Sequence, residues 1–220
     1  DLPLLADGDT GFGNAINVVR TVEQFEKAGA SGIQLEDQVF PKKCGHFAGK
    51  TVITADEMVQ KIKAAVDSRR DPDFQIVART DARSIEGLNA ALDRARAYVE
   101  AGADATFVEA PTSTGELSRI ASELPVPQIA NMVFGGKTPL TSQHELAEMG
   151  FAGVLYANAA LQVSVRAVAD MLSVLKDTGS LDSIADRLAT FDERQLLVDK
   201  EKYDDLDQRY AVANPDQSSE

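Results

Sequence analysis

One polar loop gathers several residue types that can carry out acid–base chemistry. The run Lys42-Lys43-Cys44-Gly45-His46 holds the only cysteine of the 220 residues and one of only two histidines. A thiol next to cationic groups has a lowered pKa and can transfer protons near neutral pH. The loop follows an apolar run at 32–35, which predicts a buried strand. Cys44 is therefore a candidate catalytic residue, although a surface loop with an incidental cysteine would show the same pattern.

Polar side chains also stand where five of the predicted strands end. They are Asp7 and Asp9, Glu36, Arg79, Glu109 and Asn131. In a barrel of parallel strands these ends converge on the mouth of one cavity. Carboxylates that face each other repel unless a cation lies between them, and oxygen ligands of this kind suit Mg²⁺ or Mn²⁺ rather than zinc. Arg79 supplies a planar fork that suits a substrate carboxylate.

Strands and helices alternate from the start of the chain to residue 178. Strands are predicted at 3–7, 32–37, 75–81, 106–110, 127–131 and 154–157, and helices near 14–28, 55–68, 86–101, 114–124, 141–149 and 159–178. This alternation predicts an α/β fold whose parallel strands are joined by right-handed crossovers. A (β/α)₈ barrel needs eight strands. The chain enters its first strand almost at once, so we expect two strands upstream of residue 1, and a six-stranded open sheet is the alternative.

The pattern changes after residue 178. Residues 179–210 are rich in charge with spaced Leu, Ile and Val, which predicts helices whose apolar faces pack on a neighbouring subunit. Residues 211–220 have the composition of a flexible tail. We therefore divide the chain into a barrel domain at 1–178, incomplete at its N-terminus, C-terminal helices at 179–210 and a tail at 211–220.

Net charge and composition limit the kinds of partner that the protein is expected to bind. A net charge of −13 argues against nucleic acid and anionic membrane surfaces, but it permits a small anionic substrate at a locally positive site. No apolar run approaches the roughly 20 residues of a membrane span. A single cysteine allows no internal disulfide and fits a reducing compartment, so we expect a cytoplasmic protein.

The motifs together resemble one enzyme family. They are Asp7-Gly8-Asp9-Thr10-Gly11-Phe12-Gly13, Glu36-Asp37-Gln38, Lys42-Lys43-Cys44-Gly45-His46, Ala78-Arg79-Thr80-Asp81 and Ala130-Asn131-Met132. In this order they are similar to the isocitrate lyase/phosphoenolpyruvate mutase superfamily. The Lys-Lys-Cys-Gly-His run resembles its carbon–carbon lyase branch, which includes 2-methylisocitrate, 2,3-dimethylmalate and petal-death-type lyases.

The resemblance implies a (β/α)₈ barrel and a homotetramer with its last helices swapped between subunits. It implies Mg²⁺ held by Asp7 directly and by Asp9 and Glu36 largely through water. Arg79 would bind a substrate carboxylate and stabilise an enolate. Cys44 would exchange a proton with the carbanion from a mobile loop, with His46 beside it. The pocket would be lined by Gly45, His46, Glu109 and Asn131.

The predicted function is a Mg²⁺-dependent carbon–carbon lyase. It would cleave a small branched 2-hydroxy di- or tricarboxylate, of the 2-methylisocitrate or dimethylmalate type, through an enolate. The alternatives are an oxaloacetate hydrolase or decarboxylase, a phosphoenolpyruvate-type phosphonomutase, and a non-catalytic subunit. Two departures bear on the substrate: Phe134 stands where relatives often carry glutamate, and Ala157 where lyases tend to have proline. We also expect the loop at 42–48 to act as a gate that is open or poorly ordered without ligand.

Overall fold

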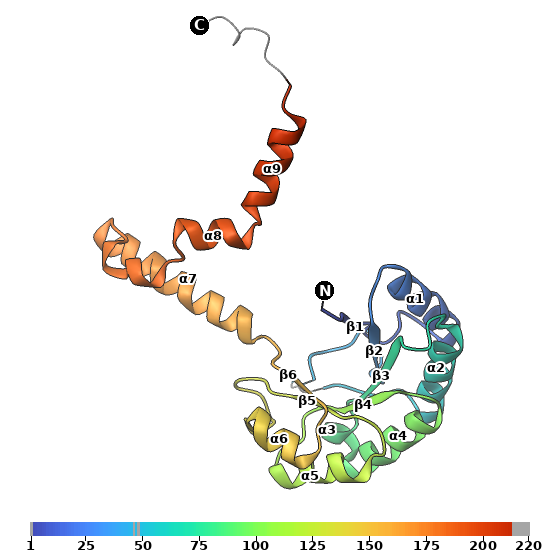
Figure 1. Ribbon diagram of the computed structural model, residues 1–220. Coiled ribbons are helices and arrows are strands. Elements are labelled where there is room, and N and C mark those ends of the chain that lie inside the picture. Colours follow the sequence, from blue (N-terminus) through green and yellow to red (C-terminus); the bar gives the residue numbers. More distant parts are fainter. Residues whose placement is uncertain (1, 46, 48, 213–220) are drawn as a thin grey trace, which may run out of the picture. The chain divides into compact units, whose positions relative to one another are not determined.

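The computed structural model describes residues 2–45, 47 and 49–212 (Figure 1). The chain divides into two compact units, Asp1–Ala160 and Leu161–Glu220. The first unit contains every alternating strand. The helix at 159–178, which the sequence analysis assigned to the barrel domain, groups almost entirely with the second unit.

The described part of the first unit contains six short strands, and all pairs between them are parallel. They are β1 (Leu5–Asp7), β2 (Gly32–Glu36), β3 (Gln75–Thr80), β4 (Ala105–Val108), β5 (Ile129–Asn131) and β6 (Gly153–Leu155). The first four form one sheet in the order β1-β2-β3-β4, and β5 pairs with β6. A parallel bridge between Thr106 and Gln128 links the two sheets. The strands thus stand side by side in sequence order, as they would in the wall of a barrel.

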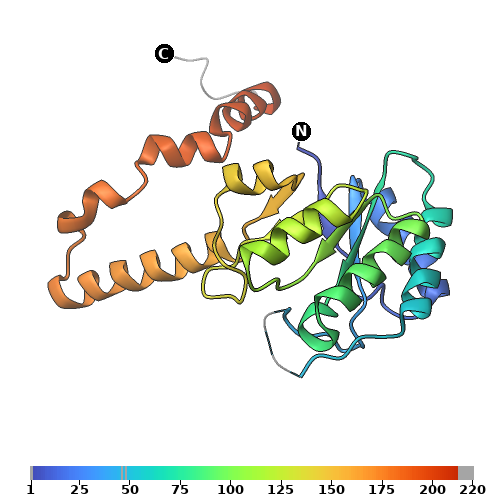
Figure 2. The same ribbon diagram turned by 90° about the horizontal axis from the view of Figure 1, so that it is seen from below.

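At least one helix separates each strand from the next. The helices are α1 (Ala15–Lys27), α2 (Ala55–Ser68), α3 (Arg83–Glu86), α4 (Leu88–Glu100), α5 (Thr114–Glu123) and α6 (Gln143–Met149). Helices α1, α2, α4, α5 and α6 each contact the next and cover one side of the strands (Figure 2). The predicted α/β alternation is confirmed. One predicted helix, at 86–101, is interrupted at Gly87, whose φ of +94° no helical residue adopts.

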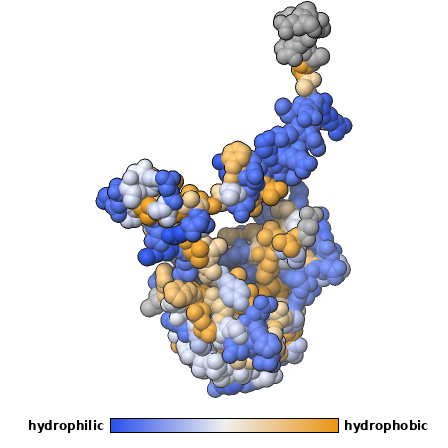
Figure 3. All heavy atoms as spheres, turned by 60° about the vertical axis from the view of Figure 1, so that its left-hand side comes forward, coloured by the Kyte–Doolittle hydropathy of each residue, from blue (hydrophilic) through white to orange (hydrophobic). Residues whose placement is uncertain are grey.

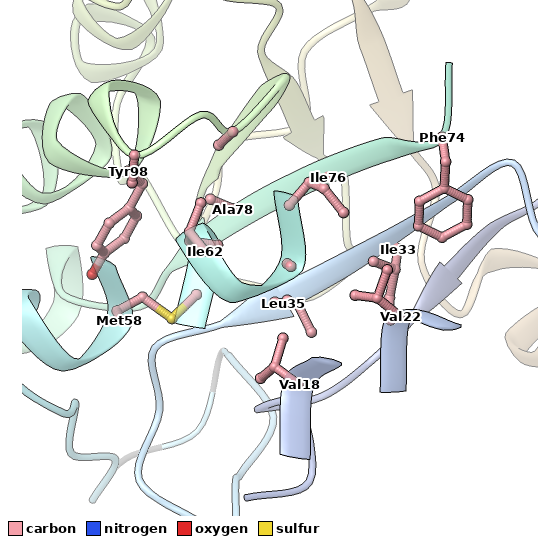
Figure 4. Packing of buried hydrophobic residues seen from close by; sticks show 13 residues of the cluster. Val18, Val22, Ile33, Leu35, Met58, Ile62, Phe74, Ile76, Ala78 and Tyr98 are labelled. Carbon is pink, nitrogen blue, oxygen red and sulfur yellow. The ribbon is translucent and has the colours of Figure 1, made fainter. Parts of the chain in front are cut away.

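The apolar core lies between the helices and one face of the sheet. Successive side chains of a strand point to opposite faces, so every second residue meets the helices. Figure 4 shows this packing for Val18 and Val22 of α1, Met58 and Ile62 of α2, and Ile33, Leu35, Ile76 and Ala78 of the strands. A second cluster joins α4, α5 and α6 to β4 and β5. Burying a large side chain of this kind contributes roughly 1.5–3 kcal/mol to stability, so packing against the helices stabilises the sheet.

The second unit consists of α7 (Ala159–Thr178), a 3₁₀ helix η1 (Asp182–Arg187), α8 (Phe191–Leu197) and α9 (Lys200–Tyr210). Described residues of this unit expose many large apolar side chains, including Leu161, Val165, Leu172, Leu196 and Leu197. Figure 3 shows hydrophobic and hydrophilic side chains side by side on its surface. None of the helices in the described ranges is long and apolar enough to cross a membrane.

Candidate active site

The strand residues that face away from the helices form the candidate active site. The strand register sets Glu36 directly beside Arg79, and Arg79 beside Phe107. Ile33, Leu35, Ile76 and Ala78 alternate with these residues along β2 and β3 and point the other way into the core. One face of the sheet therefore packs against the helices in the core, and the opposite face bears the polar groups at the strand ends.

A cavity of about 460 Å³ lies on this face. Six of its lining residues are site residues predicted from the sequence: Asp7, Cys44, Gly45, Arg79, Glu109 and Asn131. Lys42 also lines the cavity, together with apolar Leu5, Val133, Leu155 and Ala157. Asp9 and Glu36 lie within reach of the same Lys42 ammonium. His46 falls outside the described residues.

Arg79 is the buried cation of the cavity. Its Nε lies 3.0 Å from Asp81 Oδ2 and 3.5 Å from Glu36 Oε2, and its Nη2 lies 3.3 Å from Glu109 Oε2. Its guanidinium carbon is 5.3 Å from the centre of the Phe107 ring. Burial by itself lowers the pKa of Arg79, but the three carboxylates outweigh it and raise the pKa. Arg79 therefore stays charged, and the ring and Asp81 fix the plane of its fork.

All three predicted metal ligands lie around the ammonium group of Lys42. Its Nζ lies 2.7 Å from Asp9 Oδ1, 3.6 Å from Asp7 Oδ2 and 3.7 Å from Glu36 Oε2. The Asp9 backbone supports this arrangement, because its N–H donates to Asp7 Oδ1 and its carbonyl accepts from the Glu36 N–H. The three carboxylates thus converge on one cationic group.

The donor set fits a divalent cation. Among the described residues neither carboxylate oxygen of Glu36 has a hydrogen-bond partner, although the side chain is fully buried. Burial raises the pKa of Glu36 to about 7, against the lowering effect of Arg79. Within the described part of the chain, no group of three or more acidic, histidine or cysteine side chains is arranged to hold a metal ion as it stands. The Lys42 ammonium lies among the three oxygens, so direct coordination would require Lys42 to move.

The loop that carries Cys44 rests against the cavity wall. A Cβ atom on Gly45 would lie 2.5 Å from Glu109 Cγ and 2.6 Å from Arg79 Nη2. Cys44 is exposed and lines the cavity. We expected this loop to be open or poorly ordered without ligand; its residues 42–45 lie against the cavity wall, and the gating role stays a prediction. Ion pairs with Asp7, Asp9 and Glu36 hold the Lys42 side chain at this wall.

The structure adds a second layer of residues that the sequence analysis did not single out for the site. Lys50 is buried and its Nζ donates to Asp81 Oδ1 at 2.7 Å. Asp37 is also buried; its Oδ1 accepts from the Asp81 backbone N–H at 2.9 Å and its Oδ2 from the Tyr98 hydroxyl at 2.8 Å. These residues support Asp81, which in turn supports Arg79. Asp37 and Asp81 stand in the motifs quoted from the sequence, but no local signal reveals Lys50, because Lys50 and Asp81 are 31 positions apart.

The two departures near the substrate fall in different places. Ala157 lines the cavity, whereas Phe134 is 72% exposed and its neighbour Val133 lines the cavity instead. His144 lies on α6 with an exposed side chain, 3.3 Å from Glu148. Position 157 is therefore the departure that touches the candidate site.

Comparison with known proteins identifies the class. Residues 1–176 match the family model for phosphoenolpyruvate phosphomutase. The chain is 48% identical over 211 residues to 2,3-dimethylmalate lyase of Eubacterium barkeri, covering 96% of this chain and 73% of the relative. It is 46% identical to the chloroplastic carboxyvinyl-carboxyphosphonate phosphorylmutase of Arabidopsis thaliana, over 96% of this chain and 63% of the relative. It is 44% identical to 2-methylisocitrate lyase of Escherichia coli (strain K12), over 96% and 72%.

Solved structures agree with this assignment. A 2,3-dimethylmalate lyase structure superposes with a TM-score of 0.86 at 34% identity, covering 99% of this chain and 73% of that one. Oxaloacetate acetylhydrolase with the inhibitor 3,3-difluorooxalacetate gives 0.87 at 33%, over 96% and 72%. Phosphonopyruvate hydrolase with oxalate and Mg²⁺ gives 0.82 at 32%, over 95% and 73%. The chain belongs to the phosphoenolpyruvate mutase/isocitrate lyase superfamily, and its fold matches the barrel structures of that family.

Proposed function

We propose that this protein is a Mg²⁺-dependent carbon–carbon lyase that cleaves a small branched 2-hydroxy di- or tricarboxylate. The observation that carries the proposal is the cavity that Cys44 and Arg79 share with Asp7, beside Asp9 and Glu36. The lyase relatives support it, since 2,3-dimethylmalate lyase is 48% identical.

Each described residue of the site has a part in the proposed cleavage. Arg79, charged and held in plane, binds a substrate carboxylate and offsets the negative charge that develops as the carbon–carbon bond breaks. The thiol of Cys44 exchanges a proton with the carbanion carbon of the departing fragment. The Asn131 amide on β5 and the Glu109 carboxylate just after the neighbouring strand β4 orient the substrate; Asn131 Nδ2 lies 3.3 Å from Glu109 Oε2.

The cavity also suits the shape of the substrate. Its apolar wall, formed by Leu5, Val133, Leu155 and Ala157, would receive the alkyl branch, while Arg79 faces the carboxylate. Mg²⁺ held by Asp7, Asp9 and Glu36 would supply Lewis-acid charge for a developing oxyanion. We keep 2-methylisocitrate and 2,3-dimethylmalate as the leading substrates.

Turnover assays test the proposal. The protein should be incubated with 2-methylisocitrate, 2,3-dimethylmalate, isocitrate and oxaloacetate, each with Mg²⁺ and with a chelator. We expect cleavage of one branched substrate to a 2-oxo acid, with or without succinate, and loss of activity with the chelator. Turnover that survives complete metal removal would contradict the proposal, and binding without turnover of any substrate would favour a non-catalytic subunit.

The second candidate is a hydrolase, decarboxylase or phosphonomutase that stabilises a pyruvyl or oxaloacetate enolate at the same site. The similarity to oxaloacetate acetylhydrolase and to the plant phosphorylmutase favours it. Cys44 separates the lyase from the phosphonomutase, because a phosphonomutase forms a carbon–phosphorus bond at the enolate carbon and needs no proton there. Cys44→Ala should reduce lyase turnover at least a thousandfold, measured as kcat with saturating substrate. A mutase should keep its activity in the same variant.

A further inference from the structure

The loop that carries Cys44 is closed at its base and held from below by two buried side chains. Gln38 and Val52 form an antiparallel bridge, and the Val39 N–H donates to the Thr51 carbonyl at 2.9 Å. Gln38 and Lys50 therefore lie at the two ends of the loop. Gln38 is 1% exposed and Lys50 is 7% exposed, although both residue types normally face water.

Gln38 holds the residue before Cys44. Its side-chain Nε2 donates to the Lys43 carbonyl at 2.8 Å, and its Oε1 accepts from the Lys43 N–H at 2.9 Å. These two hydrogen bonds resemble those between neighbouring β-strands, and they bind both backbone polar groups of Lys43.

Lys50 holds the residue after Cys44. Its Nζ donates to the Gly45 carbonyl and to Asp81 Oδ1. Asp81 is the carboxylate that also binds the Arg79 Nε at 3.0 Å. The loop and the Arg79 guanidinium are thus fastened to the same buried carboxylate, one through an ammonium group and the other directly.

We propose that Gln38 and Lys50 are positioning residues that seat Cys44 over the cavity at a fixed place relative to Arg79. The catalytic part of this proposal rests on the proposed function. A lysine buried against a carbonyl and a carboxylate stays there only where both partners compensate for its lost hydration. Replacing it by an apolar residue leaves the Gly45 carbonyl without its donor and frees the loop.

The position of the loop that Gln38 and Lys50 fix, which we call its seat, can be tested without substrate. Trypsin cleaves after Lys42 and Lys43 only when the loop leaves its seat, because Lys42 is ion-paired with the carboxylates and the Lys43 backbone is bonded to Gln38. The rate of this cleavage is divided by the rate after Arg96 in α4, so that a general loss of stability cancels. We expect this ratio to rise at least tenfold in Lys50→Met and in Gln38→Leu. It should rise less in Gln38→Glu, which keeps the acceptor for the Lys43 N–H.

Lys63→Met is the matched control, because Lys63 is exposed on α2 and the substitution is the same. Its cleavage ratio should equal that of the unmodified protein. An unchanged ratio in both Lys50→Met and Gln38→Leu would overturn the proposal.

A kinetic arm tests the catalytic part with the substrate that the protein turns over. kcat should fall at least tenfold in Lys50→Met and Gln38→Leu, and less in Gln38→Glu, in the same order as the cleavage ratios. Loop release with an unchanged kcat would overturn the positioning role. If the unmodified protein turns over no carboxylate while the ratios rise as expected, the proposed function fails and the seat stands.

Discussion

Gly45 lies where a side chain has no room. Its missing Cβ would come within 2.6 Å of both Glu109 and Arg79, closer than real Cβ contacts. Glycine here serves close approach of the loop backbone to the charged wall of the cavity. Any larger residue has to lift the loop or displace Arg79, and either movement changes the position of Cys44 relative to Arg79.

Gly45→Ala should therefore reduce kcat about a hundredfold or more while the free energy of unfolding changes by less than about 1 kcal/mol. Steady-state kinetics and urea unfolding measure the two effects. Gly115→Ala is the matched control, since its Cβ would meet nothing closer than Ser113 Oγ at 3.8 Å. Equal activity of Gly45→Ala and Gly115→Ala would show that the seated loop is not the active one.

Glu36 makes the stability of the metal-free protein depend on pH. Burial raises its pKa to about 7 from an ordinary value of 4.5, so the folded protein binds this proton more tightly than the unfolded chain does. The stabilisation is complete below pH 4.5 and is lost as pH rises through 7, and it amounts to about 3 kcal/mol.

Glu36→Gln should remove most of this slope. Urea unfolding at pH 5 and pH 8, with a chelator present, measures it. Burial also raises the pKa of Asp37, so a slope of the same sign should remain in the variant. A slope as steep as in the unmodified protein would assign the effect to another group.

At the scale of elements, one buried carboxylate ties α4 to β3. Asp37, which follows β2, accepts hydrogen bonds from the Thr80 hydroxyl at 2.7 Å and the Tyr98 hydroxyl at 2.8 Å, and Arg94 Nη1 lies 3.6 Å away. Three elements thus meet at one side chain, directly beneath Asp81. Packing alone would allow α4 to slide along the sheet, whereas these bonds fix its position.

Tyr98→Phe should lower the free energy of unfolding by about 1–2 kcal/mol, because it removes one donor from a buried carboxylate. Chemical denaturation at pH 8 measures this change. Tyr156→Phe, at a residue that is 52% exposed, should have almost no effect. Equal effects of the two substitutions would argue against the tie.

The order of the elements follows from local patterns. An apolar run such as Ile33 to Leu35 predicts a strand wherever it lies, and glycine after a helix ends that helix: Gly29, Gly102 and Gly150 all have φ near +100°. The end of a strand is also local, so Glu36, Arg79 and Glu109 could be proposed as a site. The burial of Lys50 and Gln38 depends on contacts made by the folded loop, and no pattern in the sequence encodes those contacts.

At the scale of the whole molecule, the second unit has apolar side chains that its own helices leave uncovered. Leu196 and Leu197 are 81% and 83% exposed, and none of the described residues of α7 is buried. Exposed apolar area of this kind marks an interaction surface. We propose a neighbouring subunit as the partner, in a homotetramer that exchanges these helices.

Truncation after Thr178 should yield a smaller particle in sedimentation velocity. The shortened chain would lose the exposed apolar side chains of α8 and α9, including Leu196 and Leu197, from the proposed interface. Leu196→Asp in the full chain tests the same surface with one substitution and should shift the distribution in the same direction. An unchanged mass for both proteins would refute the proposed assembly.

Lys42 joins the loop that carries Cys44 to the carboxylates that are proposed to hold the metal ion. If Asp7, Asp9 and Glu36 hold the divalent cation as proposed, the cation would have to replace the Lys42 ammonium among these carboxylates. Such an exchange is reciprocal: whatever the lysine takes from the affinity for Mg²⁺, the bound ion takes from the hold on the loop. The loaded protein would then have a loop freed from its charge anchor and held by Gln38 and Lys50 alone. Filling the proposed metal site would therefore loosen the loop at Lys42 while its contacts with Gln38 and Lys50 remain.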